Sequence, residues 1–151
     1  MGVNRYNTQT DDFTHYRHDP DNPNSLSAND ISCIFEDKKG YLWFGTSSNG
    51  LNRYDKKTGT FTRIIHQGND SSLSSNHIAA LAEDTNNNIW VGTRSRGIDV
   101  ISAEGKHINH YQHDVFDSSG LGNNFISQIF EDRFGTMWVA TANGLSRYNY
   151  H

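Results

Sequence analysis

The sequence predicts an all-β fold built from repeated four-stranded units, and two observations support this. First, one short motif occurs three times, at 31–37, 78–84 and 126–132, and each copy is followed by a tryptophan. Its spacing of about 47 residues is typical of solenoids, arrays and β-propellers. Second, only 34% of the residues are hydrophobic and 13 are glycine, a composition that suits short strands joined by turns.

The first strand of each unit is expected at the repeated motif itself. In the first copy, Ile31, Cys33 and Phe35 alternate on one face and Ile34 lies on the other. A strand that is apolar on both faces is covered on both faces. We therefore expect 31–36 to be the innermost strand of a propeller blade, covered by a neighbouring blade on each side.

The remaining strands follow from turn residues and from alignment of the copies. Gly40 suits a tight turn after the first strand, Gly135 matches it in the third copy, and Asn88 is expected to replace it in the second. Second strands are expected at 41–46, 89–93 and 137–141. Third strands are expected at 51–55, 98–102 and 145–149, and fourth strands at 60–66 and 107–113. Four short antiparallel strands describe one propeller blade.

The chain begins and ends out of phase with this repeat. Residues 1–18 align with third and fourth strands, 31–66 and 78–113 are whole blades, and 126–150 supply first to third strands. Residues 1–151 are thus predicted to be a single β-propeller segment. Because closed rings usually have about 4–8 blades, we expect either a fragment of a larger propeller or head-to-tail self-association as a dimer or trimer.

Composition excludes several classes of protein. The net charge is −4 and no long basic run occurs, so nucleic acid is not an expected partner. No apolar run reaches the roughly 20 residues of a membrane-spanning helix, and the N-terminus does not resemble a signal peptide. The single cysteine, Cys33, excludes an internal disulfide and a cysteine-based zinc cluster.

Most residues that suggest catalysis or metal binding recur in every copy, which favours a structural role. The three Glu-Asp pairs are expected to bond the backbone of a turn, and Trp43, Trp90 and Trp138 to pack between blades. His107, His110 and His113 are close in sequence, but on a regular strand His110 points away from His107. We therefore predict no catalytic residue, no metal site and no cofactor.

Ligand binding is expected where the copies differ. In a propeller, the loop before the first strand and the loop between the second and third strands share one face. The residues predicted to bind a ligand there are Asn49, His77, Arg94, Arg96 and Asn143. Arg94 and Arg96 have uncharged counterparts and suit a carboxylate or sulfate group. The alternative is that they form a solvated basic loop.

Several segments resemble the two-component regulator propeller repeat. They are the stretches 24–31, 35–37, 40–46 and 49–55, together with a connecting loop at 16–26. The middle copy departs from the pattern at 98–101, where Ile-Asp-Val-Ile replaces Leu-x-Arg-Tyr. In that family the repeats build large propellers, commonly the periplasmic sensor region of hybrid two-component histidine kinases, and many sense oligosaccharides or other glycans.

The resemblance implies a non-catalytic, ligand-sensing propeller segment that responds to an oligosaccharide or other glycan, and the two arginines add an acidic small molecule as a further ligand class. It implies a periplasmic location for the parent family, and it assigns any kinase activity to other domains. The alternatives are a protein–protein interaction scaffold and a lyase with a propeller fold.

Overall fold

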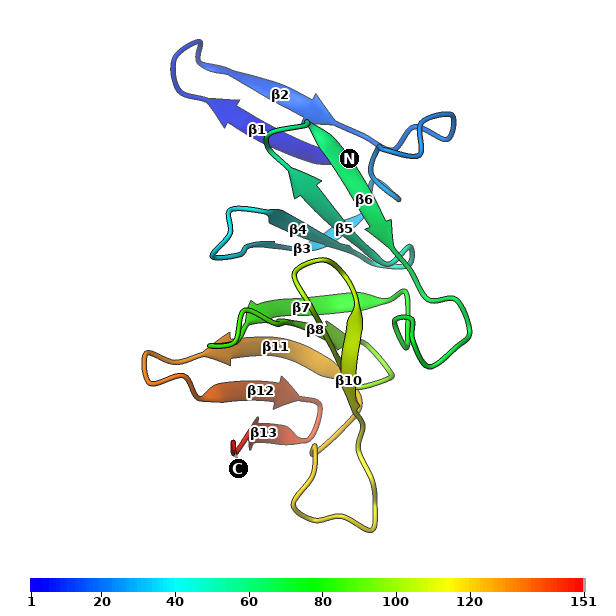
Figure 1. Cartoon of the computed structure of the whole chain (residues 1–151), viewed down its shortest axis with the longest axis vertical. Helices are drawn as coiled ribbons and strands as arrows, with labels where there is room; N and C mark the ends of the chain where they lie inside the picture. The colour runs from blue at the N-terminus through cyan, green and yellow to red at the C-terminus, as the bar shows by residue number, and fades with distance from the viewer. Residues whose placement is uncertain (151) are drawn as a thin grey trace.

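The computed structural model describes residues 1–150, which form four antiparallel sheets stacked in chain order (Figure 1). The first sheet contains β1 (Val3–Asn7) and β2 (Asp12–Tyr16). The second contains β3 (Ile31–Glu36), β4 (Leu42–Thr46), β5 (Leu51–Asp55) and β6 (Thr60–Ile64). The third contains β7 (Ile78–Glu83), β8 (Ile89–Thr93), β9 (Ile98–Ile101) and β10 (His107–Tyr111). The fourth contains β11 (Ile126–Glu131), β12 (Met137–Thr141) and β13 (Gly144–Arg147).

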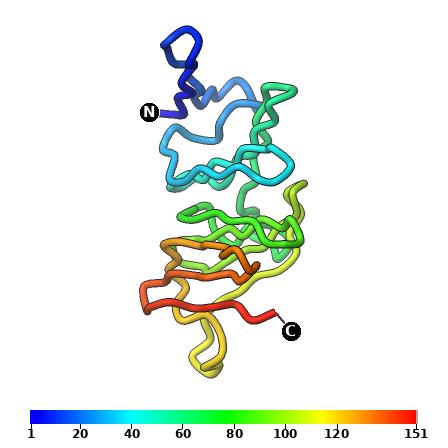
Figure 2. Tube along the Cα trace, turned by 90° about the vertical axis from the view of Figure 1, so that its left-hand side faces the viewer, coloured from blue at the N-terminus to red at the C-terminus, as the bar shows by residue number. Residues whose placement is uncertain are grey.

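The sheets stack like the blades of a propeller. Each follows the chain order, so its first strand lies at one edge and its last strand at the other. The first strand β7 contacts both β3 and β11, which makes these three strands the inner line of the stack. The two chain ends lie at opposite ends of the stack (Figures 1 and 2). The predicted fold class, all-β with four-stranded antiparallel blades, is confirmed.

The hydrophobic core is divided into layers, one between each pair of adjacent sheets. The first layer contains Leu26, Phe44 and Phe61, with Val3 and Tyr16 from the first sheet packed against it. The second layer is centred on Trp43, Leu51, Ile78 and Val91. The third is centred on Trp90, Ile98, Ile126 and Val139. Each blade is therefore stabilised mainly by its immediate neighbours.

Two glycines let adjacent blades approach each other closely. A Cβ on Gly45 would lie 2.7 Å from Cγ2 of Ile78, and a Cβ on Gly92 would lie 2.6 Å from Cγ2 of Ile126. In both cases the isoleucine begins the inner strand of the next blade. Ala140 occupies the equivalent position in β12, where no inner strand of a further blade lies against it in residues 1–150.

The repeated aspartate and tryptophan form one structural unit in each blade. Asp37 accepts hydrogen bonds from the backbone N–H groups of Lys39 (3.0 Å) and Tyr41 (2.9 Å) and from Nε1 of Trp43 (2.8 Å). The same aspartate–tryptophan bond measures 2.9 Å for Asp84–Trp90 and for Asp132–Trp138. The prediction that these aspartates bond the turn backbone is confirmed.

The glutamates of the Glu-Asp pairs also have structural contacts. Glu83 is 5% exposed, and its Oε2 accepts the backbone N–H of Lys38 in the neighbouring blade (2.9 Å). Lys38 also donates from Nζ to the backbone oxygen of Asp84 (3.0 Å). These bonds connect the turn between β3 and β4 to the turn between β7 and β8.

Both fourth strands end two residues earlier than expected, at Ile64 and Tyr111, and two further details of the predicted strands are wrong. The residue with positive φ in the turn after β7 is Asn87 (φ 63°), not Asn88, because Asn87 aligns with Gly40 and Gly135. Ile34 is 62% exposed rather than covered. Ile34 pairs with Phe44 on the face toward the first sheet. Within the described residues that sheet contains only β1 and β2, so no inner strand covers Ile34.

None of the residues from 1 to 150 belongs to a helix long and apolar enough to cross a membrane.

Candidate functional site

The loops that precede the first strands and the loops between second and third strands meet at one end of each blade. We call them the mouth loops: 27–30, 47–50, 74–77, 94–97, 122–125 and 142–143. In each blade a backbone hydrogen bond joins the two loops. The bonds are Ser47 N–H to Asp30 O (3.1 Å), Arg94 N–H to His77 O (3.0 Å) and Ala142 N–H to Phe125 O (3.1 Å).

Mouth loops of adjacent blades are also bonded to each other. Gly50 donates its N–H to Asn76 O, and Gly97 donates to Asn124 O, both at 2.9 Å. The Asn76 side chain accepts the backbone N–H of His66 (2.8 Å), and the Asn124 side chain accepts the backbone N–H of His113 (2.7 Å). The mouth loops therefore form one continuous, internally bonded band across the blades.

The five residues predicted to bind a ligand are all exposed at this band. The backbone N–H of Asn49 donates to Oγ1 of Thr46 (2.9 Å), and that of Asn143 donates to Oγ1 of Thr141 (3.1 Å), so both side chains stand on fixed turns. His77 and Arg94 lie together through their backbone bond.

The structure separates Arg94 from Arg96. Arg94 directly follows strand β8, and its backbone N–H bonds His77 O in the loop before β7. Arg96 instead lines a hollow of about 740 Å³ between the β6–β7 connection and the strands β9 and β10. Arg96 is therefore part of the lining of this hollow, and Arg94 is not.

The hollow is lined by two carboxylates and three imidazoles, a combination that strand periodicity does not predict. Its lining residues are His66, Gly68, Asn69, Asp70, Ser72, Ser74, Arg96, Asp99, His107, Ile108, Asn109, His110 and Gln112. Asp99 is fully buried, and its Oδ1 accepts Nδ1–H of His110 (3.0 Å) and lies 3.4 Å from Nε2 of His107. Its Oδ2 accepts the backbone N–H and the hydroxyl of Ser74, both at 2.9 Å.

The expectation that His110 points away from His107 is wrong. The register of β10 against β9 shifts between His107 and Asn109, and this bulge inserts Ile108 into the strand. An extra residue reverses the alternation of side chains beyond it. Both imidazoles therefore reach Asp99.

The other repeated histidines have a structural role. His18, His66 and His113 each donate Nδ1–H to a leucine backbone oxygen in the connection before the next blade, at 2.6 Å in every case. In the described part of the chain, no group of three or more acidic, histidine or cysteine side chains is arranged to hold a metal ion.

The Asp99–His110 pair makes stability depend on pH. Its hydrogen bond to Asp99 raises the pKa of His110 above 6.5, while burial acts in the opposite direction. Burial alone would raise the pKa of Asp99, but hydrogen bonds from His110 and Ser74 hold it below 3.8. The contribution of His110 to the free energy of unfolding is therefore complete below pH 6.5 and is lost as the pH rises through its raised pKa.

We expect a His110→Gln variant to be less stable than the unchanged chain, mainly at pH values below the raised pKa of His110. Melting temperatures measured from about pH 5.5 to about pH 9 should show a difference that shrinks as the pH rises. His107 and Arg96 are the other basic side chains near the pair and stay unchanged in this comparison. The control is His15→Gln, because His15 occupies the same strand position but bonds Asn4. An equal pH trend in both variants would contradict the assignment.

The stacked four-stranded sheets and their band of mouth loops define the chain as a segment of a β-propeller. Residues 25–48, 72–95 and 120–143 match the family model described as "Two component regulator propeller". The chain therefore contains three two-component regulator propeller repeats. The resemblance seen in the sequence is thereby confirmed.

Solved structures share this fold. The extracellular domain of a putative hybrid two-component system from B. thetaiotaomicron is 23% identical with a TM-score of 0.53, over 99% of this chain and 25% of that one. PorZ, a surface component of the type-IX secretion system of Porphyromonas gingivalis, is 17% identical with a TM-score of 0.66, over 95% of this chain and 22% of PorZ. Virginiamycin B lyase from Staphylococcus aureus is 16% identical with a TM-score of 0.64, over 97% of this chain and 47% of the lyase.

The chain thus spans about a quarter of the length of that extracellular domain from B. thetaiotaomicron. A search of curated protein sequences finds no significant match.

Proposed function

We propose that this chain is a ligand-recognition segment of an extracytoplasmic sensor propeller and carries no catalysis of its own. The observation that supports this most is the band of mouth loops, in which variable exposed side chains stand on a repeated, hydrogen-bonded framework. Such a framework holds binding residues in place while their identity changes from blade to blade. The matched repeats and the likeness to the extracellular domain of a putative hybrid two-component system agree with this role.

The proposed ligand is an oligosaccharide, with an acidic group bound at Arg94. Asn49, His77 and Asn143 supply polar groups along the same band, and the Arg94 guanidinium suits a carboxylate or sulfate. Because Arg96 lines the hollow, we assign the acidic group to Arg94 alone. Head-to-tail association with further copies stays a prediction and would extend the band.

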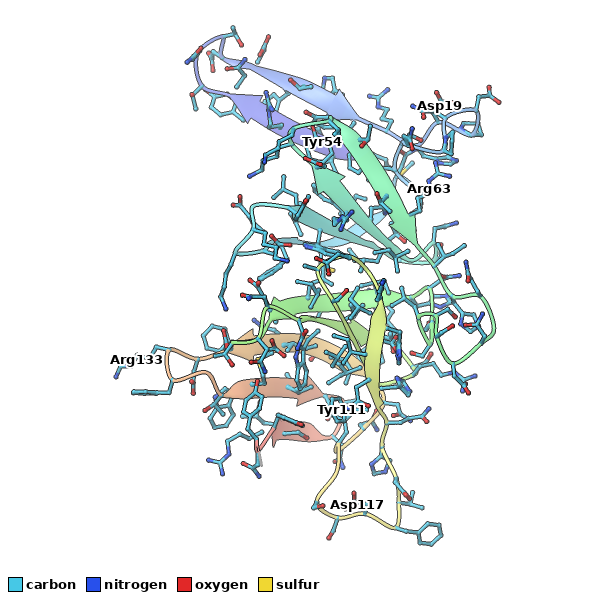
Figure 3. The ribbon with its side chains drawn as sticks, in the orientation of Figure 1. Asp19, Tyr54, Arg63, Tyr111, Asp117 and Arg133 are labelled. Atoms are coloured by element: carbon cyan, nitrogen blue, oxygen red, sulfur yellow. The ribbon has the colours of Figure 1, made fainter. Side chains whose placement is uncertain are left out.

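A glycan array containing uronic-acid and sulfated sugars tests the proposal. We expect selective binding, weakened about tenfold by Arg94→Ala because a charge-assisted contact is lost. Arg133→Ala is the matched control: Arg133 is an exposed arginine in the turn between β11 and β12, at the opposite end of its blade (Figure 3). Equal weakening in both variants would refute the assignment of Arg94.

Two other results would favour the alternatives. Failure to bind any glycan, together with stable binding of a protein partner, would support an interaction scaffold. Turnover of a captured sugar would support an enzyme, and the shared fold of virginiamycin B lyase makes this assay worth including.

A further inference from the structure

The hollow in the blade β7–β10 lies where the preceding blade holds an arginine of its own. In that blade Arg63 on β6 is the cross-strand partner of Asn52 on β5. Its Nε donates to Ser25 O (3.0 Å), and its Nη2 donates to Asn22 O (3.1 Å), Ser25 Oγ (3.0 Å) and Leu26 O (3.1 Å). The guanidinium is thus inserted among the oxygens of the connecting loop that also carries Asp19 (Figure 3).

The next blade keeps the same loop conformation. Asn22 Oδ1 accepts the N–H two residues ahead (3.0 Å), and Asn69 Oδ1 does the same (3.1 Å). Ser25 Oγ and Ser72 Oγ each accept a backbone N–H from the loop start at 2.9 Å. The leucine that follows each serine accepts a histidine Nδ1–H at 2.6 Å. The oxygens of Asn69 and Ser72, which line the hollow, are therefore arranged like those of Asn22 and Ser25 in the first loop.

The arginine that those oxygens would bind is absent from this blade. His110 is the cross-strand partner of Asp99, as Arg63 is of Asn52, but its imidazole bonds Asp99 instead of the loop. Ser25 is buried under Arg63, whereas Ser72 is half-exposed. In residues 1–150 no side chain fills the place of the guanidinium, and the hollow of about 740 Å³ remains.

The charges at the hollow also differ from those in the preceding blade. Asn52 is replaced by the carboxylate of Asp99, and Asp70 stands among the lining residues. Arg96 is the permanent cation of the lining and is exposed to solvent, where its charge is screened. The lining imidazoles of His66, His107 and His110 add positive charge only when protonated.

We propose that this hollow binds a guanidinium group supplied from outside the chain, held by the loop oxygens of Asn69 and Ser72 beside Asp99. A guanidinium presents five N–H donors in one plane and matches a set of converging oxygens. The chain itself shows the arrangement one blade earlier, with Arg63 as the built-in occupant. The hollow adjoins the mouth loops at Ser74 and Arg96, but its lining does not include Arg94, to which the acidic group of the glycan is assigned.

Backbone amide NMR shifts of residues 68–74 test the proposal directly. We expect agmatine and a peptide with one internal arginine to shift these amides, with a dissociation constant of about a millimolar. The same peptide with citrulline has nearly the same shape without the charge and should leave them unchanged. Tighter binding of the arginine peptide than of agmatine would identify a protein side chain as the natural source; equal binding would identify a small molecule.

Variants separate a guanidinium site from an anion site. Asp99→Asn combined with His110→Arg rebuilds the Asn52–Arg63 pair and should abolish the response, since the chain then fills its own hollow. Arg96→Ala removes a like charge and should strengthen agmatine binding about threefold, whereas it would weaken an anion. Arg63→Ala opens the equivalent hollow one blade earlier, and agmatine should raise the melting temperature of that variant.

Three results would overturn the proposal. They are unchanged amides at 68–74 in tens of millimolar agmatine, an equal response to the citrulline peptide, or shifts caused by sulfate or glucuronate that Arg96→Ala removes. None of them bears on glycan binding by Arg94, because the two sites are read from different amides and different variants.

Discussion

Replacing Asp37 by alanine is expected to lower the free energy of unfolding by about 3 kcal/mol. The variant loses two backbone bonds within the turn and leaves the Nε1–H of Trp43 without its acceptor. Trp43 is fully buried, so water does not replace the lost bond. Equilibrium unfolding in urea measures the change.

Two comparisons show whether the loss comes from this network. Asp37→Asn should also destabilise, because an amide cannot accept at both of its ends and a donor would face a donor. Asp55→Ala should cost well under 1 kcal/mol, since Asp55 accepts one backbone N–H, from Lys57, in an exposed turn. If Asp37→Ala proved no worse than Asp55→Ala, the aspartate–tryptophan unit would not be a main source of blade stability.

Gly92→Ala is expected to lower the free energy of unfolding by about 2 kcal/mol through overpacking. The added methyl group would lie 2.6 Å from Cγ2 of Ile126 and 3.2 Å from Cβ of Ala80, closer than such atoms approach without movement. Because Ile126 belongs to the next blade, the cost would appear as a displacement between blades. Thermal or urea unfolding measures it.

A double-mutant cycle with Ile126→Ala isolates the contact. That substitution removes Cγ2, so adding Gly92→Ala on top of it should cost much less than adding it to the unchanged chain. Strict additivity of the two changes would show that glycine is needed at this position for another reason. Ala140 fits the steric account, because a methyl group is present at the one equivalent strand position that no further inner strand covers within residues 1–150.

The fold could be predicted because the pattern of strands and turns is repeated along the sequence. Each strand was identified in two or three copies, and the strands β3, β7 and β11 lie at 31–36, 78–83 and 126–131. The roles of the repeated aspartates followed from turn chemistry alone. The error at Asn88 arose from an alignment shifted by one residue. Gly40 and Gly135 each follow the aspartate of their copy by three residues, and the residue at that spacing from Asp84 is Asn87.

The hollow could not be predicted from strand periodicity. It depends on the bulge at Ile108, which brings His107 to Asp99 and leaves no regular pattern in the sequence. It also depends on a contact between a loop and strands that lie about 25 residues apart, such as Ser74 with Asp99. One signal was available: the middle copy departs from its siblings at 98–101, and Asp99 lies in that departure.

The layered core has a consequence for how such proteins change over evolutionary time. Every layer is shared by two adjacent blades and by no others, as the clusters around Leu26, Trp43 and Trp90 show. Duplicating one segment of about 47 residues therefore adds a blade together with the layer that secures it, and leaves the existing layers intact. Gene duplication can lengthen the array in single steps, and each new blade brings a pair of loops whose sequence is free to diverge.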